Sequence, residues 1–294
     1  MSFVHLHVHS EYSLLDGCAR IPDLVAAAQR LGFDALALTD HGAVYGAVPF
    51  TQAMRAAGLK PILGAELYVV DEYGPPPKPA QPYHLPLLAA DEEGYVHLLE
   101  LITRGHLDHF HKKPLLTLAE IAPRAGGLIA LSGCLRGQVA RRALEGDRAG
   151  ARAALRAHCE VFGRGRFFLE LQRHGLAEED RINGALIELG RAEGVEYVAT
   201  NDVHYLTREE AATHDLLLAV QTLSLVEQEN RLRLPAPEYY LKSGAEMAEL
   251  FRDAPEAVAN AARLAGDCRF ALELGRRRIP AFPVPPGLDE ISYL

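Results

Sequence analysis

The 294-residue sequence is poor in cysteine. It has four cysteines, which are widely spaced and form no C-x-x-C pair: Cys18, Cys134, Cys159 and Cys268. This spacing does not indicate a disulfide framework, and it excludes a zinc knuckle built from cysteines alone. Any metal site in this chain must therefore take most of its ligands from other residue types.

Long hydrophobic runs are also missing. No apolar stretch is long enough to cross a bilayer, and no basic segment followed by an apolar run marks a secretory leader. We therefore expect a cytoplasmic protein without a membrane partner. The loop motifs G-x-x-x-x-G-K-[ST], G-x-G-x-x-G and G-x-S-x-G are absent as well. Nucleotide binding by a glycine-rich loop and a serine nucleophile elbow thus have no candidate.

Positive charge is in deficit, since 30 Lys and Arg face 39 Asp and Glu, a net charge of −9. A broad, sequence-blind coat on DNA needs a basic surface, so this balance argues against one. Metal-binding carboxylates would enter the same sum, so the total does not describe a local site. The chain is long enough to bury a large core as one α/β barrel or as two smaller domains.

What the sequence does contain is a histidine-rich start, F-V-H-L-H-V-H-S. His5, His7 and His9 alternate with apolar residues, a period of two that predicts a strand. Side chains two apart on a strand point to one face, so three imidazoles project together. A core gains nothing from this arrangement, whereas a divalent metal gains nitrogen ligands. Parity alone does not say which two of the three bind.

Short apolar strands and amphipathic helices alternate after this segment. The predicted helices are 21–31, 45–57, 92–104, 147–162 and 178–194, and the further predicted strands are 35–38, 60–70, 84–90, 127–131, 167–171 and 195–200. The alternation implies a parallel sheet with right-handed crossovers. About seven strands predict a barrel of the TIM type with fewer than eight strands. The proline-dense segment 73–82 is expected to be a stiff loop.

The strand pattern stops near residue 207, which we take as the end of a barrel core spanning residues 1–207. Residues 208–278 are predicted to be a helical extension packed on the barrel, with a helix pair at 245–251 and 254–268. Residues 279–294 begin with a proline-rich run and are expected to be a linker towards further domains.

Candidate ligands gather at the strand ends. In a parallel barrel the carboxyl ends of the strands converge on one mouth, so residues remote in sequence can share a site. The first, second, third and last strand ends all carry histidine or carboxylate side chains. With neighbouring candidates the set is His7, His9, Asp16, His41, Glu66, His84, Cys134, Asp202 and His204.

The ligand types point to a catalytic centre. Mixed imidazole and carboxylate sets suit zinc, manganese or iron, and they are typical of sites that leave a position open to water. Several such ligands around more than one metal are typical of phosphate-ester hydrolysis, in which a metal lowers the pKa of its bound water and stabilises the phosphoryl oxygens. No protein side chain is therefore singled out as the nucleophile.

The motifs H-L-H-V-H-S, L-T-D-H-G, G-A-E, Y-H-L-P-L-L-A, L-S-G-C, F-L-E-L-Q and A-T-N-D-V-H-Y closely resemble the PHP (polymerase and histidinol phosphatase) domain. More narrowly, they are similar to the PHP domain at the N-terminus of bacterial DNA polymerase III alpha subunits. The helical continuation after residue 205 resembles that polymerase as well. The resemblance implies a distorted (β/α)7 barrel with a trinuclear metal site at its mouth.

The resemblance also implies how three divalent ions would divide the ligands. One set would be His7, His9, Glu66 and Asp202; a second, sharing Glu66, would include His84 and Cys134; the third would be Asp16, His41 and His204. His5 is left as a non-ligand. Some polymerase alpha subunits have lost part of this set, whereas all nine positions here carry competent ligands. Cys134 is the softest of them and makes its subsite the least certain.

Three other features have mainly structural interpretations. His106, His109 and His111 match no ligand of the family and are interpreted as a surface feature in a loop. Glu170 could line the mouth or be a polar residue of the barrel interior. The arginine stripe 148, 152, 156 on one helix face is interpreted as solvated, although it could face DNA phosphates.

Three functions compete at this point. The first is the PHP domain of a replicative polymerase with 3′–5′ exonuclease (proofreading) chemistry carried out by metal-bound hydroxide on a DNA 3′ end. The second is a metal-stabilised scaffold that supports the other polymerase domains and, as a further candidate partner, a proofreading exonuclease subunit. The third is a free-standing phosphatase of the histidinol phosphatase kind, which an ending just after a linker disfavours. The polymerase's own catalytic aspartates would lie outside this chain.

Overall fold

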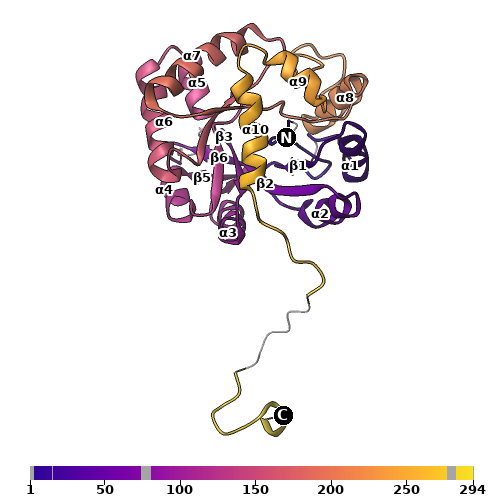
Figure 1. Ribbon diagram of the computed structural model, residues 1–294, viewed down its shortest axis with the longest axis vertical. Coiled ribbons are helices and arrows are strands. Elements are labelled where there is room, and N and C mark those ends of the chain that lie inside the picture. Colours follow the sequence, from indigo (N-terminus) through magenta and orange to yellow (C-terminus); the bar gives the residue numbers. More distant parts are fainter. Residues whose placement is uncertain (1–2, 15, 74–80, 277–282, 294) are drawn as a thin grey trace.

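Strands far apart in the sequence lie side by side in one curved sheet, and helices cover its outer face (Figure 1). The computed structural model describes residues 3–14, 16–73, 81–276 and 283–293. Six of the seven predicted strands are present: β1 (Ala35–Leu38), β2 (Lys60–Val70), β3 (Tyr83–Ala89), β6 (Leu128–Leu131), β7 (Phe167–Leu171) and β8 (Tyr197–Ala199). They follow one another in the order β1-β2-β3-β6-β7-β8. The α/β fold expected from the sequence is confirmed.

The seventh predicted strand, the histidine-rich start, is not a ladder strand. Within residues 3–9 the structure has one isolated bridge, from Val8 to Val203. The segment still closes the ring through its backbone. Ala37 and Thr39 donate to the carbonyls of His5 and Val8 on one side, while on the other the His9 N–H donates to the carbonyl of Val203. With this closure the sheet is the expected distorted seven-membered barrel.

The expectation of a wholly parallel sheet is wrong for β3. It pairs antiparallel with both β2 and β6, whereas β1–β2, β6–β7 and β7–β8 are parallel. Antiparallel neighbours need no crossover helix between them, and the described residues of the connection from β2 to β3, 71–73 and 81–82, contain none. Its consequence matters for the site, since the amino end of β3, where His84 lies, reaches the same mouth as the carboxyl ends of the parallel strands.

The helices form where the sequence supplies both an apolar face and a start signal. They are α1 (Ile21–Arg30), α2 (Ala47–Ala56), α3 (Glu92–Leu107), α5 (Gln138–Leu144), α6 (Arg148–Phe162) and α7 (Ala177–Glu193). Asp91 and Asp147 cap α3 and α6 by accepting the backbone N–H groups of Gly94 and Gly150. Because buried residues of α1, α3, α6 and α7 join one apolar core with the strands, the barrel packs around a single core.

A small addition near α3 was not predicted. Helix α3 continues three residues beyond the expected Arg104, and β4 (Phe110–His111) and β5 (Lys113–Thr117) form a hairpin after it. Strand β5 pairs in parallel with the far half of the long β2. Short helical turns, α4 (Leu118–Ile121) and η1 (Ala122–Arg124), lead from it to β6. The hairpin places Lys113 close to the barrel mouth, which matters below.

The region after β8 is helical, with η2 (Arg208–Glu210), α8 (Ala211–Gln221), α9 (Gly244–Leu250), α10 (Pro255–Asp267) and the short α11 (Glu290–Tyr293). Helices α9 and α10 correspond to the predicted helix pair. Helix α10 crosses the barrel wall (Figure 1) and buries Ala257, Ala261 and Leu264 in the same core as the strands. This packing is consistent with an extension attached to the barrel, although the boundaries at 207 and 278 stay predictions.

Two predicted features lie partly outside the described residues. These are most of the proline-dense loop 73–82 and the first residues of the predicted linker 279–294. Among the described residues, no helix is both long enough and apolar enough to cross a membrane.

Candidate metal centre

The nine candidate ligands meet at one end of the ring. Each lies in a short segment that leaves or enters a barrel strand at that end, apart from Glu66 and His84, which lie within β2 and β3. Each of the nine side chains lies within 4.0 Å of another member, and the longest of these contacts joins His84 and Cys134. The structure therefore gathers residues that are up to 197 positions apart into a single cluster, though whether the cluster holds metal is a separate question.

Glu66 is the centre of the cluster. Its Oε1 lies 2.7 Å from His84 Nδ1 and 3.4 Å from His7 Nε2. Its Oε2 lies 2.7 Å from His41 Nδ1 and 3.7 Å from His9 Nε2. Alternation along β2 explains this placement, because a buried strand at the mouth can direct a single side chain inward while its neighbours pack in the core. One carboxylate thus faces four imidazoles.

Asp202 approaches the first histidine pair from the opposite side. Its Oδ1 lies 3.3 Å from His7 Nε2 and 3.2 Å from His9 Nε2, and those two nitrogens are 3.1 Å apart. The backbone of Asp202 has φ 44°, in the left-handed region that non-glycine residues seldom adopt. Such conformations concentrate at functional sites, where the surrounding structure holds them. Here it directs the carboxylate towards the histidines.

A third group lies beside these two. His41 Nε2 is 3.0 Å from one carboxylate oxygen of Asp16, and His204 Nε2 is 3.6 Å from the other. The rings of His41 and His204 both pack against the ring of His9, with centroids 4.2 and 4.4 Å away. Asp16 itself is held by its backbone carbonyl, which accepts a hydrogen bond from His214 Nε2 at 2.6 Å. His214 on α8 thus supports the cluster from the helical extension.

Cys134 is the least connected of the nine. Its Sγ lies 4.0 Å from His84 Nδ1, and both side chains line the same cavity. Burial raises the pKa of the thiol well above its usual value, and the nearby charges of Asp202 and Glu66 raise it further. A thiol in this setting is a weak nucleophile unless a cation sits beside it.

A second layer of residues fixes which nitrogen of each ring faces the cluster. His7 Nδ1 lies 2.7 Å from Glu170 Oε1, so an Nδ1–H donating to this carboxylate leaves Nε2 as an acceptor on the inside. His9 Nδ1 lies 2.9 Å from Ser13 Oγ, which itself donates to Asp40. The same arrangement gives His7 and His9 a free Nε2 lone pair for a shared ligand.

Sequence reasoning missed most of this layer. Glu170 was interpreted as either a mouth or an interior residue, and its partner His7 could not be known from the strand pattern. Asp40 was seen only as part of the T-D-H-G motif, yet it accepts from the backbone N–H of Ser10 at 2.7 Å and from Ser13 Oγ at 2.8 Å. The usable signal was a carboxylate on a strand otherwise entirely apolar, F-L-E-L.

The electrostatics of the cluster are strongly coupled. Burial alone would raise the pKa values of Glu66 and Asp202, but the surrounding histidines lower both well below their usual range. Conversely, burial would lower the pKa of His41, but Glu66 and Asp16 raise it to about 9. Burial lowers the pKa of His9 to about 3, helped by the neighbouring His41 and His204. The carboxylates of the cluster are therefore ionised, and the neighbouring imidazoles differ in how readily they bind a proton.

Several buried side-chain atoms of the cluster that could bind a metal have no hydrogen-bond partner among the described residues. They are Glu66 Oε2, Asp202 Oδ1 and His41 Nδ1. His41 Nδ1 and Glu66 Oε2 are 2.7 Å apart, yet they are not aligned for a hydrogen bond. Unpaired buried polar groups are costly, so their lone pairs call for a cation. Three triplets have ligand atoms within 4.8 Å of one another: His7-His9-Glu66, His41-Glu66-His84 and His9-His41-His204. The donor set fits borderline to hard divalent ions.

The cluster opens into a cavity of about 210 Å³. Asp16, His41, His84, Asp202 and His204 lie along its floor, and Leu234, Pro235 and Tyr239 contribute to its walls. The walls come from the segment between α8 and α9, so part of the predicted extension shapes the access to the cluster. A small anionic group can therefore reach the donor atoms from solvent.

Three remaining histidines of the two rich stretches, His5, His106 and His109, have partners other than the cluster, and the side chain of His111 lies outside the described residues. The Nε2–H of His5 donates to the carbonyl of Lys242, 2.7 Å away, and the ring packs edge-on against Phe3 and Phe33. His106 Nε2 donates to the carbonyl of Gly42, and His109 Nε2 lies 2.9 Å from Glu120 Oε1. His106 lies on α3 and not in a loop, which corrects that part of the prediction.

Comparison with known proteins gives a consistent family. Residues 5–174 match the family described as "PHP domain". The chain is 43% identical over its full length to an "Error-prone DNA polymerase" of Symbiobacterium thermophilum, of which it covers 28%. It is 40% identical to a "DNA polymerase III subunit alpha" of Treponema pallidum, with 97% of this chain and 25% of that protein aligned. For the same subunit of Thermus aquaticus the identity is 39%, with 100% and 25% aligned. The chain thus spans about a quarter of the length of these relatives.

Proposed function

This chain belongs to the PHP domain family, and we propose that it is the N-terminal metal-dependent phosphoesterase domain of a bacterial DNA polymerase III alpha subunit. Its specific activity would be removal of nucleotides from DNA 3′ ends. The observation that carries the proposal is the cluster around Glu66, in which buried carboxylate and imidazole atoms without partners open into a solvent-accessible cavity. Such an arrangement serves metal binding and not packing.

Nine residues are proposed to hold up to three divalent ions, zinc, manganese or iron. His7, His9, Asp202 and Glu66 would hold one ion, and Glu66 with His84 and Cys134 would hold a second. The third set is Asp16, His41 and His204. The grouping is supported by the short distances within each set, apart from Cys134, whose 4.0 Å contact to His84 is longer.

Divalent ions in such a site lower the pKa of a bound water and stabilise charge on phosphoryl oxygens. The chain's own residues provide the framework for this chemistry. Glu170 holds His7, and Ser13 with Asp40 holds His9, so the ligand nitrogens keep one orientation. The overall reaction adds one water across the terminal P–O3′ bond: OH goes to phosphorus, and the hydrogen goes to the 3′ oxygen of the shortened strand.

The proposed partners follow from the same reasoning. They are a DNA 3′ end, the remaining domains of a longer polymerase chain, and a proofreading exonuclease subunit. The relatives are polymerase subunits about four times the length of this chain, which supports the second. A cytoplasmic location goes with DNA replication in bacteria.

The test is release of a labelled 3′ nucleotide from single-stranded DNA by the metal-replete chain, with manganese or zinc present. Asp202→Asn keeps the size of the side chain but removes the charge beside His7 and His9, so it should abolish release. His5→Ala is the matched control, because His5 contacts Lys242 and not the cluster. Equal release by Asp202→Asn and the unmodified chain would attribute the activity to another site. No release by either, with metals bound, would favour a metal-stabilised scaffold.

A further inference from the structure

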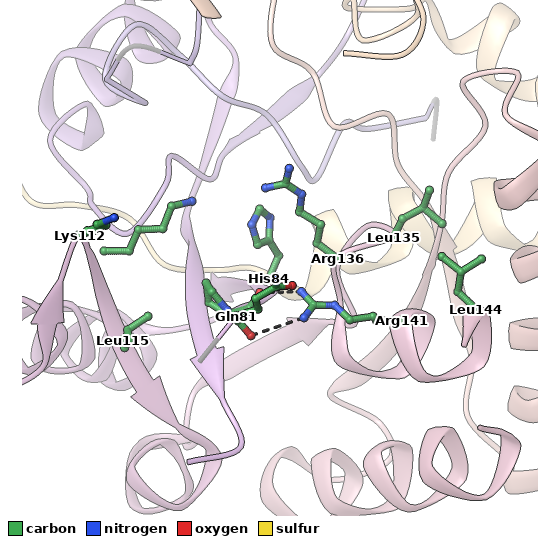
Figure 2. Close-up of a pocket in the computed structure, with 10 residues that line it drawn as sticks. Gln81, His84, Lys112, Leu115, Leu135, Arg136, Arg141 and Leu144 are labelled. Atoms are coloured by element: carbon green, nitrogen blue, oxygen red, sulfur yellow. Dashed lines mark hydrogen bonds between the residues drawn. The ribbon is translucent and has the colours of Figure 1, made fainter. Parts of the chain in front are cut away.

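A second, larger cavity lies beside the metal centre (Figure 2). It encloses about 600 Å³ between the start of β3, the start of β5 and the segment that leads from β6 into α5. Leu135 and Leu144 form one wall, with Lys112 across from them, and His84 lies between Arg136 and Arg141. The cavity is thus apolar along one side and basic around its rim.

The two cavities adjoin each other. His84, Leu135 and Arg136 line both the basic pocket and the cavity above the ligand cluster. His84 is itself 2.7 Å from Glu66 Oε1, so one side chain separates the pocket from the centre of the cluster. A molecule with its phosphate at the cluster would therefore have the basic pocket next to it.

The charges that line the basic pocket are all positive. Among the described residues that form it there is no carboxylate. Within the part of the chain that the structure describes, the guanidinium of Arg136 has no hydrogen bond or ion pair, and the side chain is exposed. Arg141 differs, because its Nη2 donates to the carbonyl of Pro82 at 2.8 Å and its guanidinium lies over the ring of Tyr83. Arg141 builds the wall, whereas Arg136 is free to bind a ligand.

Lys113 supplies a second cation from the β5 side. Its Nζ lies 4.0 Å from the centre of the Tyr68 ring. The same ring packs against both His41 and His84, with centroids 5.7 and 5.3 Å away. The ring of Tyr68 thus contacts Lys113 and also packs against two candidate ligands. Burial and the charge of Arg136 lower the pKa of Lys113, which Glu66 and Asp16 oppose, and an anion bound beside the two basic side chains would favour their charged forms.

We propose that the basic pocket seats the terminal nucleoside of a single-stranded 3′ end, with Arg136 and Lys113 holding its phosphate at the edge of the metal centre. This inference rests on the proposed phosphoesterase function and names the part of the substrate that the site recognises. A base and its sugar can pack against the apolar wall of Leu135 and Leu144. Such contact does not depend on which base is present. A planar guanidinium suits bidentate binding of phosphate oxygens.

The experiment measures binding, so it does not depend on turnover. The probe is a fluorescent single-stranded oligonucleotide with a free 3′ hydroxyl and a phosphorothioate at its last linkage, titrated with metal-replete protein. Arg136→Ala should weaken binding about tenfold, since a hydrogen-bonded charge contact is lost. The slope of log affinity against log salt should also fall by about 0.7, the value for one phosphate contact on a single strand. Arg136→Lys should retain the slope.

Arg148→Ala is the charge-matched control, because Arg148 lies at the start of α6 and lines a different groove. It should bind as the unmodified chain does. Equal affinity and salt slope for Arg136→Ala and the unmodified chain would overturn the proposal, as would an equal loss in Arg148→Ala.

Competition separates the ligand sources: deoxythymidine 5′-monophosphate should displace the probe better than inorganic phosphate, and equal displacement would remove the nucleoside from the proposal. A chain that binds as expected but never hydrolyses DNA would refute the proposed function alone.

Discussion

The segment at residues 5–9 and the segment at residues 106–111 are both rich in histidine, but different groups reach them in the folded chain. His7 and His9 lie on extended backbone inside the ring, where Glu66 and Asp202 approach them from β2 and from the segment after β8. In the other segment His106 bonds a backbone carbonyl, and His109 pairs with Glu120 and stacks on Tyr73. Density of histidine in sequence therefore does not by itself make a site.

The histidines also differ in how many carboxylates surround them, as a comparison of His5 with His7 shows. Burial lowers the pKa of His5 to about 4, and the charge of Glu246 offsets this only in part. His7, two residues on, is equally buried, yet Asp202, Glu170 and Glu66 raise its pKa well above the usual value. The barrel brings the acidic groups to His7 and not to His5. What distinguishes the metal centre is convergence of charges from separate strands, whereas His106 contacts a backbone carbonyl and His109 a single carboxylate.

The largest effect should come from Glu66→Gln, which removes the charge that four histidines of the cluster share. We expect bound metal to fall to at most one ion per chain, with affinity at the affected positions reduced by about 100-fold or more. Equilibrium dialysis followed by elemental analysis measures this. His109→Gln is the counterpart in the other segment and should leave metal content unchanged. A reverse ranking of the two variants would undo the comparison.

Chelation should destabilise the protein strongly, because metal bound only by the folded chain adds to its free energy of unfolding. Each ion held at about 100 times its dissociation constant contributes about 2.7 kcal/mol. For a chain of this size each kcal/mol shifts the melting temperature by about 2–4 °C. Calorimetry with and without excess chelator should therefore differ by several degrees. An unchanged melting temperature would mean that the histidine cluster is stable without ions.

Glu170→Gln tests the layer behind the metal centre. The variant keeps the shape but weakens the acceptor that orients His7, so metal affinity should fall by about 10- to 100-fold while the ligand set stays intact. The control is Glu193→Gln, which removes a buried acceptor of Arg156 on the outer helices and should leave metal affinity unchanged. Full metal affinity in Glu170→Gln would show that His7 needs no second partner.

His106→Ala should have the smallest effect. It removes one hydrogen bond to the carbonyl of Gly42, and the net cost should be about 1 kcal/mol of unfolding free energy. Chemical denaturation would measure this change. Metal content should stay the same, because His106 supports the loop after His41 through the backbone alone. A variant that loses metal would place the second segment inside the site.

Much of the fold could be predicted because its signals are local. Six strands and most helices show apolar residues at the spacing of their element. The ends of several helices coincide with capping or glycine residues such as Asp91 and Gly32. The reversed direction of β3 was not predicted, because it follows from pairing with β2 and β6 and leaves no mark on the apolar pattern of the strand itself. The histidine segment also reads as a strand, although most of its backbone partners are not arranged as a ladder.

The site could be predicted in part for a different reason. Ligand types are visible in sequence, so His41, Glu66 and Asp202 stand out against apolar neighbours. Which of them meet depends on the curvature of the sheet, and that is not a local property. The supports at Glu170 and Asp40, and the basic pocket beside His84, arise from pairs of residues on different strands. A single sequence carries no signal for such pairs, apart from a charged residue where the pattern expects an apolar one.

The most direct test of the metal centre is the number of ions bound per chain. The purified protein should be stripped, dialysed against manganese or zinc, freed of loosely held ions and then measured by elemental analysis. The same measurement on a His7→Ala, His9→Ala double variant and on a His106→Ala, His109→Ala double variant compares the two histidine segments directly. We expect up to three ions per chain in the unmodified protein and in the second variant, and a clear loss in the first. Absence of bound metal in the unmodified chain, or equal content in all three proteins, would contradict the account.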